Sequence, residues 1–521
     1  MTVTPRHARR IHAHQNPAFD SPSSENFSTT SADFLLRDLA ADPWGLVTPS
    51  VYETGRLVAT APWLPRHDQR LTYLVEWQRG DGGWGPPDLG YCLVPSLSAV
   101  DALLRVEGRP DVDAAADAGI SFLRRALAAA VPLPDTPAID LIVPSLLETL
   151  NQRLSPSLPI PATITDRRLR AVRRAARTTP ELPTKLAHAL EVLGPDARGR
   201  GHLSVNGAVG ASPAATAAWL GNARDSAAYE YLASTVHRHD GPVPVCAPIA
   251  TFERCWVLAA LTRAEIPFTD PAGLLHELDI QLGPQGLPTA PGLPTDADTT
   301  AAALYVLARH GYRHTPDPLR PYERYDNYCT WPGEDGTSVT TNAHVLETLT
   351  FIDNNSGTVP SPSAAKLIDW LCVQQRPDGS WLDRWHASPY YATKAAALAL
   401  HDHELTNPTA RDAVRHARRW ILDSQRVDES WGIWAGSAEE TAYALQTLIQ
   451  TTTSPHPEVH RAVARGVSAL EYGALAAPAL WHDKDLYRPG RIIAAEILTA
   501  VHLCGSWHVP GRGTTTTSET P

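Results

Sequence analysis

Apolar residues recur at helical spacing along most of the 521-residue chain, and this pattern restricts the fold more than any other feature. In many segments they occupy positions i, i+3, i+4 and i+7, the spacing of an amphipathic helix with one buried face. Gly or Pro follows several segments, where a helix is expected to stop. Strand patterns are sparse, so the sequence predicts an all-α protein built from helical hairpins. The segments are 98–107, 185–194, 251–264, 300–311, 344–352, 364–375, 441–450 and 491–503.

A short loop motif recurs between these predicted helices. QRGDGGW (78–84), QRPDGSW (375–381) and QRVDESW (425–431) share Gln-Arg, Asp and Trp at fixed offsets. The last two begin about 50 residues apart, and repeats of that length are typical of helical arrays. We expect Asp and Gly to form a turn, Gln to reach a free helix terminus, and Trp to fill the gap between neighbouring helices. Hairpins braced in this way can close into an α/α barrel.

Length, charge and cysteine content limit the classes of function. The chain exceeds one typical domain, so two large domains are expected. Its formal net charge is −11, which argues against a nucleic-acid partner. No stretch approaches 18 consecutive apolar residues, so no transmembrane segment is expected. The six cysteines form no CxxC pair, which fits a reducing, cytoplasmic setting. We expect a disordered lead-in at 1–30 and a disordered tail at 511–521.

Two aspartates, Asp296 and Asp298, stand directly before the Ala-rich helical segment at 301–311. Taken alone they fit a helix cap, because Asp is a preferred N-cap residue and complements the helix dipole. They lie at the end of the second of two Pro-rich breaks, 155–165 and 283–296. We expect the second break to be a domain junction, and catalytic groups often lie in the cleft at such a junction. Local reasoning therefore leaves both capping and catalysis open.

Residues 296–300 read DADTT, which resembles the DxDTT form of the Asp-rich motif of class II terpene cyclases, specifically the bacterial class II diterpene cyclases related to copalyl diphosphate synthase. The loops at 78–84 and 375–381 are similar to the QxxDGxW loops of that family. The resemblance covers roughly residues 35–505. Further segments that resemble the family, in chain order, are 182–191, 212–220, 241–261, 340–349, 388–400 and 480–491.

The resemblance implies two α/α barrels, called β and γ, with γ inserted after the first helix of β and the active site between them. We therefore expect residues 31–54 to hold the first helix of β, residues 55–285 the γ barrel, and residues 286–510 the rest of β with the Asp motif. Neither a DDxxD nor an (N/D)DxxSxxxE pattern is present in the sequence. We expect no class I α domain, and a product that keeps its diphosphate.

The chemistry of a class II cyclase explains why carboxylic acids are needed. Protonation of an alkene requires an acid that is still protonated at rest, and an apolar cavity keeps a carboxyl group protonated because burial disfavours its charged form. The resemblance implies that Asp298 donates the proton, with Asp296 as a neighbour that raises its pKa. Thr299 and Thr300 complete the motif, and the Thr299 hydroxyl can donate to a carboxylate. The resemblance further implies that Asn342 hydrogen-bonds the acid; a helix-cap amide is the alternative.

His188 matches a histidine that, in plant relatives, pairs with an asparagine to activate a deprotonating water. The partner position here is Val245, so the dyad is incomplete and the stereochemistry of the plant product does not transfer. A packed histidine remains an equally good interpretation of His188.

Candidate groups for the diphosphate and for the cations of the reaction follow from the same resemblance. Lys484 and Arg488 are spaced i, i+4 and would clamp a diphosphate, with a solvated basic pair as the alternative. The resemblance implies Mg²⁺, for which Asp81 and Asp88 are the candidate ligands, although Asp81 also fits a turn role. Candidate aromatic side chains for cation stabilisation are Trp385, Tyr390 and Tyr391, with core packing as the alternative.

We expect cyclisation of geranylgeranyl diphosphate to a bicyclic labdane-, halimane- or clerodane-type diphosphate, which a separate class I synthase or phosphatase would consume. A drimenyl-type cyclase acting on farnesyl diphosphate is the alternative within the family, and the resemblance allows a homodimer. A squalene–hopene-type cyclase is disfavoured by the shorter chain. A protein prenyltransferase needs an Asp/Cys/His zinc site, and the Asp–Cys spacing at 325–329 is wrong for it. A non-catalytic helical scaffold is the rival from another class.

Overall fold

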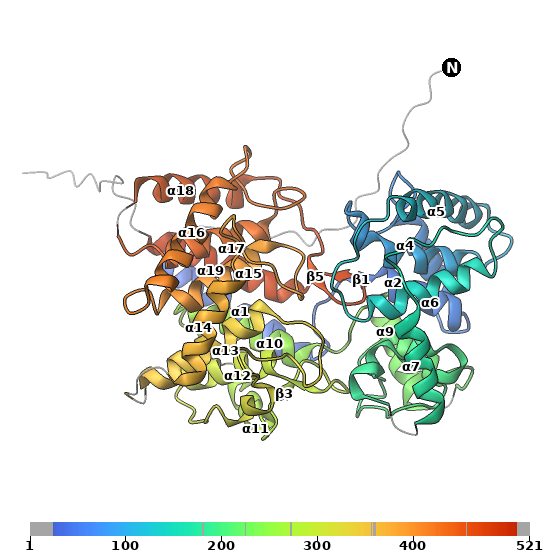
Figure 1. The fold of residues 1–521 in the computed structure, drawn as a ribbon, viewed down its shortest axis with the longest axis horizontal. Coiled ribbons are helices and arrows are strands. Elements are labelled where there is room, and N and C mark those ends of the chain that lie inside the picture. The colour runs from blue at the N-terminus through green and yellow to red at the C-terminus, as the bar shows by residue number, and fades with distance from the viewer. Residues whose placement is uncertain are drawn as a thin grey trace, which may run out of the picture.

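The computed structural model describes residues 24–179, 182–224, 226–270, 273–355, 357, 361–454 and 456–507. Within these residues it is almost entirely helical, and the helices gather into two bodies that stand side by side (Figure 1). None of the described helices is long and apolar enough to cross a bilayer. Helix α1 begins at Ser24, inside the range expected to be a lead-in, and the rest of that range lies outside the described residues, as does the predicted tail.

The larger body is built around a closed ring of inner helices. Consecutive members pack on each other in the order α10, α12, α13, α15, α17 and α19, and α19 packs back on α10 to close the ring. All of these helices bury Ala together with Leu, Ile or Val, as expected for helices packed on every side. The inner helices are α10 (Ala250–Arg263), α12 (Ala297–Arg309), α13 (Val339–Asn355), α15 (Pro389–His401), α17 (Ala438–Gln450) and α19 (Gly490–Ser506).

Outer helices cover this ring. They bury one stripe only, and α16 and α18 keep their charged residues on the opposite face. Helix α1 packs on α19 and α10, α11 on α12, α14 on α13, α16 on α15 and α17, and α18 on α17 and α19. The outer elements are α1 (Ser24–Ala41), α11 (Leu274–Gln281), the 3₁₀ helix η2 (Asp317–Tyr322), α14 (Pro362–Gln374), α16 (Pro408–Asp423) and α18 (Pro457–Tyr472). The larger body is therefore an α/α barrel.

The smaller body repeats the same architecture with a ring formed by α2, α4, α6, the 3₁₀ helix η1 and α8, in which α8 packs back on α2. Helices α3, α5, α7 and α9 lie outside the ring. The elements are α2 (Val51–Thr60), α3 (His67–Glu76), α4 (Leu89–Leu103), α5 (Pro110–Ala128), α6 (Ile139–Asn151), α7 (Arg167–Thr178), η1 (Thr184–Ala197), α8 (Pro213–Leu220) and α9 (Ala227–Arg238).

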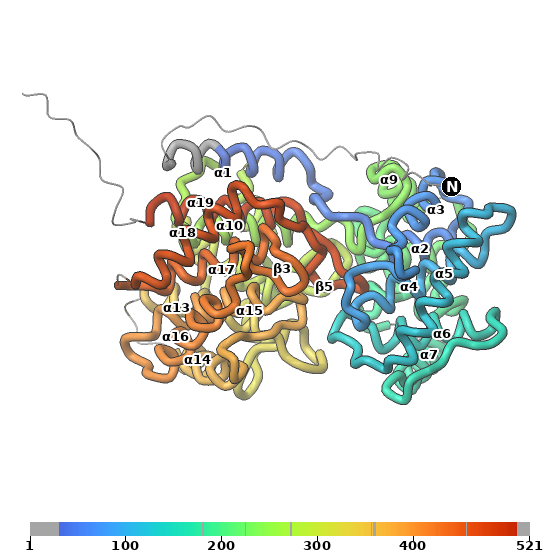
Figure 2. Tube along the Cα trace, turned by 90° about the horizontal axis from the view of Figure 1, so that it is seen from above, coloured from blue at the N-terminus to red at the C-terminus, as the bar shows by residue number. Residues whose placement is uncertain are grey.

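The chain passes between the two bodies at places that differ from the predicted boundary. Helix α1 lies along the larger body (Figure 2), as expected for 31–54, and α2 already belongs to the smaller one. The predicted range 55–285 also contains α10 and α11, and these pack in the ring and outer layer of the larger body. The return crossing therefore lies near residue 245, before α10. The Pro-rich break at 283–296 is a loop within the larger barrel, because its residues pair with the start of α12.

Short two-residue strands fix the connections. Strand β3 (Leu287–Pro288) pairs antiparallel with β4 (Thr295–Asp296), so that Leu287 faces Asp296 immediately before α12. In the larger body β5 (Trp481–His482) pairs with β6 (Leu486–Tyr487), and the resulting hairpin lies at the junction of the bodies near β1, as Figure 1 shows. In the smaller body β1 (Pro49–Ser50) pairs with β2 (Val243–Pro244).

The three repeated loops make the same contacts, which confirms that they brace the barrels. Trp84, Trp381 and Trp431 are fully buried, and each indole donates a hydrogen bond to the backbone carbonyl ten residues earlier. Each loop glutamine donates to the carbonyl of a neighbouring outer helix, at 2.8 Å for Gln78 and Gln375. The loops therefore tie consecutive outer helices together, α3 to α5, α14 to α16 and α16 to α18.

Candidate active site

The inner helices of the larger barrel all present their N-terminal ends to the smaller body. Loops that precede three of them contact it directly: Gly333 before α13 accepts a hydrogen bond from Lys185, Arg384 before α15 pairs with Asp135, and Asp483 before α19 bonds to His188. The helix dipoles therefore direct partial positive charge toward the junction. Asp298 lies in this ring of helix starts.

Asp296 is the N-cap of α12. Its Oδ1 accepts the Thr299 amide at 2.7 Å, and its Oδ2 accepts the amide and the hydroxyl of Thr289 at 3.1 and 2.9 Å. Burial raises the pKa of Asp296 to about 7, and the nearby charge of Asp298 adds to the effect. Thr300 fixes the same turn, because its hydroxyl donates to the Asp296 carbonyl and accepts the Leu287 amide. The capping interpretation is thus correct for Asp296.

Asp298 stands one residue inside the helix and has a different partner. It is 7% exposed, and its Oδ1 lies 2.7 Å from Nδ1 of His344 on α13. Within the described residues its second carboxyl oxygen makes no hydrogen bond. The acid is held on one side by an imidazole and is available on the other.

Asn342 does not hydrogen-bond the acid, contrary to the prediction. Its amide donates to the carbonyls of Tyr328 and Ser338 and accepts the Tyr328 amide at 2.7 Å, so it anchors a loop to the start of α13. Residues two apart on a helix point in nearly opposite directions, so Asn342 and His344 cannot both face Asp298. The segment TTNAHVLE holds both side chains, and the correct one could be chosen only once the orientation of α13 was known.

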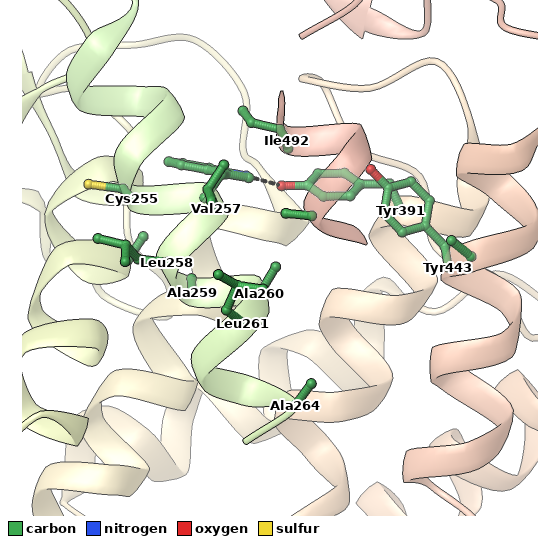
Figure 3. Close-up of a cluster of buried hydrophobic side chains, with 14 of the residues drawn as sticks. Cys255, Val257, Leu258, Ala259, Ala260, Leu261, Ala264, Tyr391, Tyr443 and Ile492 are labelled. Carbon is green, nitrogen blue, oxygen red and sulfur yellow. Dashed lines mark hydrogen bonds between the residues drawn. The ribbon is translucent and has the colours of Figure 1, made fainter. Parts of the chain in front are cut away.

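A small cavity of about 20 Å³ lies in the lumen one helical turn below Asp298. At the end near the acid it is lined by Trp256, His344 and Tyr391. The Tyr391 hydroxyl accepts the indole N–H of Trp256 at 2.8 Å, the dashed bond in Figure 3. Burial raises the pKa of Tyr391 well above its usual value, and the charge of Asp298 contributes, which places this ring beside the acid.

The far end of the cavity is closed by two buried ion pairs. Arg263 binds Glu347 through two hydrogen bonds of 2.7 Å, and Lys394 binds both oxygens of Glu496 at 2.7 Å. Contact between a hydrocarbon chain and these charged groups is not favourable. Access to the acid is therefore expected from the junction of the two bodies rather than through the barrel.

The other two predicted aromatic side chains lie elsewhere. Tyr390 points outward and packs on Trp420 of α16, with ring centroids 4.6 Å apart, so core packing describes it better. Trp385 lies at the junction, edge-on to Trp331 at 5.2 Å, and its indole N–H is buried with no hydrogen-bond partner within the described ranges.

His188 is paired with an aspartate that the sequence did not suggest. Its Nε2 lies 2.7 Å from Asp483 and its Nδ1 2.6 Å from the Gly210 carbonyl, so both ring nitrogens are engaged. Burial alone would lower the pKa of His188, but the Asp483 carboxylate raises it above its usual value.

Lys484 is not available to a diphosphate, contrary to the prediction. It is 1% exposed and its ammonium contacts Glu53, Glu191 at 3.0 Å, and the Ser212 hydroxyl at 2.7 Å. These partners come from the smaller body, so Lys484 joins the two bodies. Arg488 is half-buried, and within the described part of the chain its guanidinium forms no ion pair.

Both predicted metal ligands already serve other contacts, although Oδ2 of Asp88 makes no hydrogen bond within the described residues. Asp81 pairs with Arg79 at 2.7 Å and accepts the Gly83 amide, and Asp88 is the N-cap of α4 and accepts the amides of Gly90 and Tyr91. Among the described residues no group of three or more His, Cys, Asp or Glu side chains could hold a metal ion. Asp81 and Asp88 therefore do not fit a magnesium site.

Comparisons with known proteins identify relatives of this chain. The sequence profile of the squalene-hopene cyclase C-terminal domain matches residues 334–467. The chain is 42% identical to the ent-copalyl diphosphate synthase of Streptomyces sp. (strain KO-3988), over 90% of this chain and 94% of that one. It is 38% identical to the labda-7,13-dienyl diphosphate synthase of Streptomyces clavuligerus, over 92% and 94%.

A solved structure shares the fold. The ent-copalyl diphosphate synthase from Streptomyces platensis is 42% identical, covers 92% of this chain and 99% of its own, and superimposes with a TM-score of 0.84. The chain therefore belongs to the bacterial class II diterpene cyclases, the isomerases of the copalyl and labdadienyl diphosphate synthase family.

Proposed function

We propose that this chain cyclises geranylgeranyl diphosphate to a bicyclic diterpenyl diphosphate and leaves the diphosphate in place. The observation that carries the proposal is the buried Asp298, bonded to His344 on one oxygen and placed above an aromatic-lined cavity. The skeleton, whether labdane, halimane or clerodane, depends on where the last proton leaves.

Asp298 is the proposed proton donor. When Nδ1 of His344 donates to Oδ1, the acidic proton of Asp298 resides on Oδ2, the oxygen without a protein partner. Transfer of that proton to the terminal alkene leaves a carboxylate, which the imidazole and the N-terminal end of α12 stabilise. Asp296 supports the acid by holding the first turn of α12 in place.

Tyr391 and Trp256 are the proposed cation-stabilising side chains. Their rings line the cavity beside the acid and are fixed to each other by the hydroxyl–indole hydrogen bond. A cation over the face of such a ring is stabilised by about 0.5–2 kcal/mol. The ring of Trp256 also stands edge-on to His344, with centroids 5.7 Å apart, so it keeps the imidazole oriented.

Arg488 is the proposed contact for the diphosphate, supported by its position at the junction and its lack of an ion pair within the described residues. Mg²⁺ would neutralise the diphosphate, and it would rest mainly on substrate oxygens because Asp81 and Asp88 are engaged. Turnover measured with excess EDTA and then with added Mg²⁺ tests this. Full activity in EDTA would remove the ion from the proposal.

The substrate is tested with C15 and C20 prenyl diphosphates, each incubated with purified protein and analysed before and after phosphatase treatment. We expect only the C20 chain to be consumed and the cyclic product to be extracted only after phosphatase. Cyclic hydrocarbon before phosphatase would contradict diphosphate retention, and consumption of the C15 chain alone would establish the drimenyl-type alternative. No turnover of either chain would favour a scaffold.

The product of such a reaction still carries an allylic diphosphate. A separate class I synthase or a phosphatase is the proposed consumer, and we propose a cytoplasmic location, supported by six cysteines without disulfide partners. A homodimer is compatible with this scheme, and light scattering on the purified protein decides it.

A further inference from the structure

Glu439 on α17 occupies a position in the larger barrel that mirrors the position of Asp298. The ring order α12, α13, α15, α17 places α17 directly opposite α12. Asp298 and Glu439 are each the second residue of their helix, so both lie at the junction end of the lumen.

The lumen-facing stripe of α17 confirms this orientation. Tyr443, one turn after Glu439, contacts the ring of Tyr391 at 5.4 Å and lies under the ammonium of Lys394, and both of these residues line the cavity. Gln446 donates to Glu496, another cavity residue. Positions i, i+4 and i+7 of a helix share one face, so Glu439 also faces the lumen. The stripe of Asp298, Ala302 and Tyr305 on α12 has the same spacing.

The two oxygens of Glu439 have very different surroundings. Oε1 accepts three hydrogen bonds, from Nε2 of His386 at 3.1 Å, the Tyr443 hydroxyl at 3.0 Å and the Trp481 indole at 2.8 Å. The Ser388 amide donates to Nδ1 of His386, so Nε2 carries the proton that reaches Glu439. Oε2 is buried and has no hydrogen-bond partner among the residues that the structure describes, and Glu439 is 3% exposed.

An unpaired buried carboxylate oxygen is costly, and such groups in a native structure usually serve a ligand. The rings of His386, Trp481 and Tyr443 lie 4.9, 4.9 and 5.4 Å from the ring of Tyr391, so the carboxylate lies in the aromatic cluster next to the acid. A hydrocarbon cation carries no N–H or O–H group. Its C–H bonds can therefore approach an oxygen to which no hydrogen-bond donor is bound. Three donors converge on Oε1, so Glu439 acts there as a hydrogen-bond acceptor.

We propose that Glu439 is the base that ends the cyclisation. The C–H bond on a carbon next to the cationic centre breaks, its electron pair becomes the new alkene, and the proton goes to Oε2 of Glu439. Asp298 has given one proton and Glu439 has received one, so the reaction is an isomerisation. This assignment rests on the proposed function. It differs from the expectation for His188, whose two nitrogens are both engaged.

The adjacent Glu440 provides a matched control. It is also buried, but both of its oxygens are hydrogen-bonded: Oε1 by the Ser388 hydroxyl and the Ile433 amide, and Oε2 by the Ser437 hydroxyl. It belongs to the N-terminal cap of α17 and has no free oxygen.

The experiment compares wild type, Glu439→Gln and Glu440→Gln with geranylgeranyl diphosphate in D₂O, analysing dephosphorylated products. All three should incorporate deuterium at the protonated end of the chain, because initiation is intact. Glu439→Gln should lower the share of the wild-type alkene about tenfold or more, in favour of other alkenes or an alcohol formed by water. Glu440→Gln should keep the wild-type product. Circular dichroism verifies folding, and Glu439→Asp, which withdraws the carboxylate by one methylene, replaces a variant that fails to fold.

Three results would overturn the assignment: the wild-type product at the wild-type rate from Glu439→Gln, the same product change in Glu440→Gln, or loss of all cyclisation in folded Glu439→Gln. A terminal base acts after protonation, so its loss cannot prevent initiation. Failure of the proposed function is seen separately, as absence of any deuterated cyclic product from the wild type.

Discussion

Asp296 and Asp298 differ because they stand on the two sides of a helix start. Asp296 is outside the helix and closes its first turn, where it accepts three hydrogen bonds. Asp298 is inside, and its side chain emerges from the helix toward α13 and the lumen, where His344 is its one hydrogen-bond partner in the described part of the chain. Two residues of the same type therefore have different chemistry, because one serves the backbone and the other is available to a ligand.

Replacement of Asp298 by Asn should abolish cyclisation and leave the fold intact. Asn keeps the shape and a hydrogen bond to His344 but has no acidic proton, and the loss of a general acid lowers kcat by about 10²–10⁴-fold. Product formation from geranylgeranyl diphosphate measures the effect, with thermal unfolding as the control for structure. Turnover close to the wild-type rate would assign the proton to another group.

Asp296 should make stability depend on pH in the opposite sense to a salt-bridged aspartate. Burial raises its pKa to about 7 from an ordinary value of 3.8, so between these values the folded chain holds a proton that the unfolded chain has released. The free energy of unfolding therefore falls as pH rises from about 4 to 7, by at most about 1.4 kcal/mol per unit. Urea unfolding of wild type and Asp296→Asn at several pH values measures the contribution of Asp296. If the free energy of unfolding changed equally with pH in the two proteins, the prediction would be wrong.

The sequence identified both aspartates but not their partners. The DADTT motif is local, so its place at a helix start could be predicted from neighbouring residues alone. His344 comes from α13 and Trp256 from α10, and only the closed ring brings them to the acid. Lys484 was misassigned for a related reason: its burial depends on Glu53, which lies in the other body.

At the scale of elements, the repeated loops show how one turn geometry is reused with different residues. In each loop the glutamine amide also donates to a backbone carbonyl within the loop itself. The accepting residues are Gly82, Gly379 and Glu429, and all three have positive φ, at 92°, 95° and 69°. Glycine adopts this conformation without strain, whereas a residue with a Cβ pays about 1–2 kcal/mol.

Glu429→Gly should therefore stabilise the protein by about 1 kcal/mol, and Gly379→Ala should destabilise it. A Cβ at Gly379 would lie 2.5 Å from the carbonyl oxygen of His416, so strain and collision add. Thermal unfolding of both variants beside the wild type measures the two shifts. A lower midpoint for Glu429→Gly would show that the Glu429 side chain makes a stabilising contact that outweighs the strain.

Helices and bracing loops were predictable because their signals are periodic and local. The short strands were not, because each is only two residues long and forms only where distant segments meet, as Pro49 and Pro244 do. The boundary near residue 245 was missed for the same reason: α10 is helical by its own pattern, but only its packing on α12 and α19 assigns it to the larger barrel.

At the scale of the whole molecule, Lys484 holds the two barrels together. Its ammonium is fully buried between Glu53 and Glu191, over the ring of Tyr52 at 5.3 Å. Burial opposes its charge, but the two glutamates keep its pKa above the usual value, so it remains charged. The ion pairs of Lys484 therefore connect the β5–β6 hairpin to the smaller body.

Lys484→Met should destabilise the protein by about 3–5 kcal/mol, because it leaves two carboxylates buried without a counter-charge. Adding Glu53→Gln should recover part of this loss by removing one of them. Urea unfolding of the single and double variants gives the coupling energy. A loss under about 1 kcal/mol for Lys484→Met would show that water replaces the ammonium at little cost.

The order of the helices along the chain also determines when each one can pack on its partners during synthesis. Asp38 of α1 and Arg491 of α19 are hydrogen-bonded, although 453 residues separate them. At 5–20 residues per second a ribosome needs roughly 20–90 s to make that span. During this time the smaller barrel can fold, whereas the apolar stripe of Ala32, Leu36 and Leu39 still lacks α19, one of the two helices on which α1 packs. Helix α1 therefore keeps apolar surface exposed for most of the time that the chain is being synthesised. The yield of the protein should respond to chaperones that shield such surface on nascent chains.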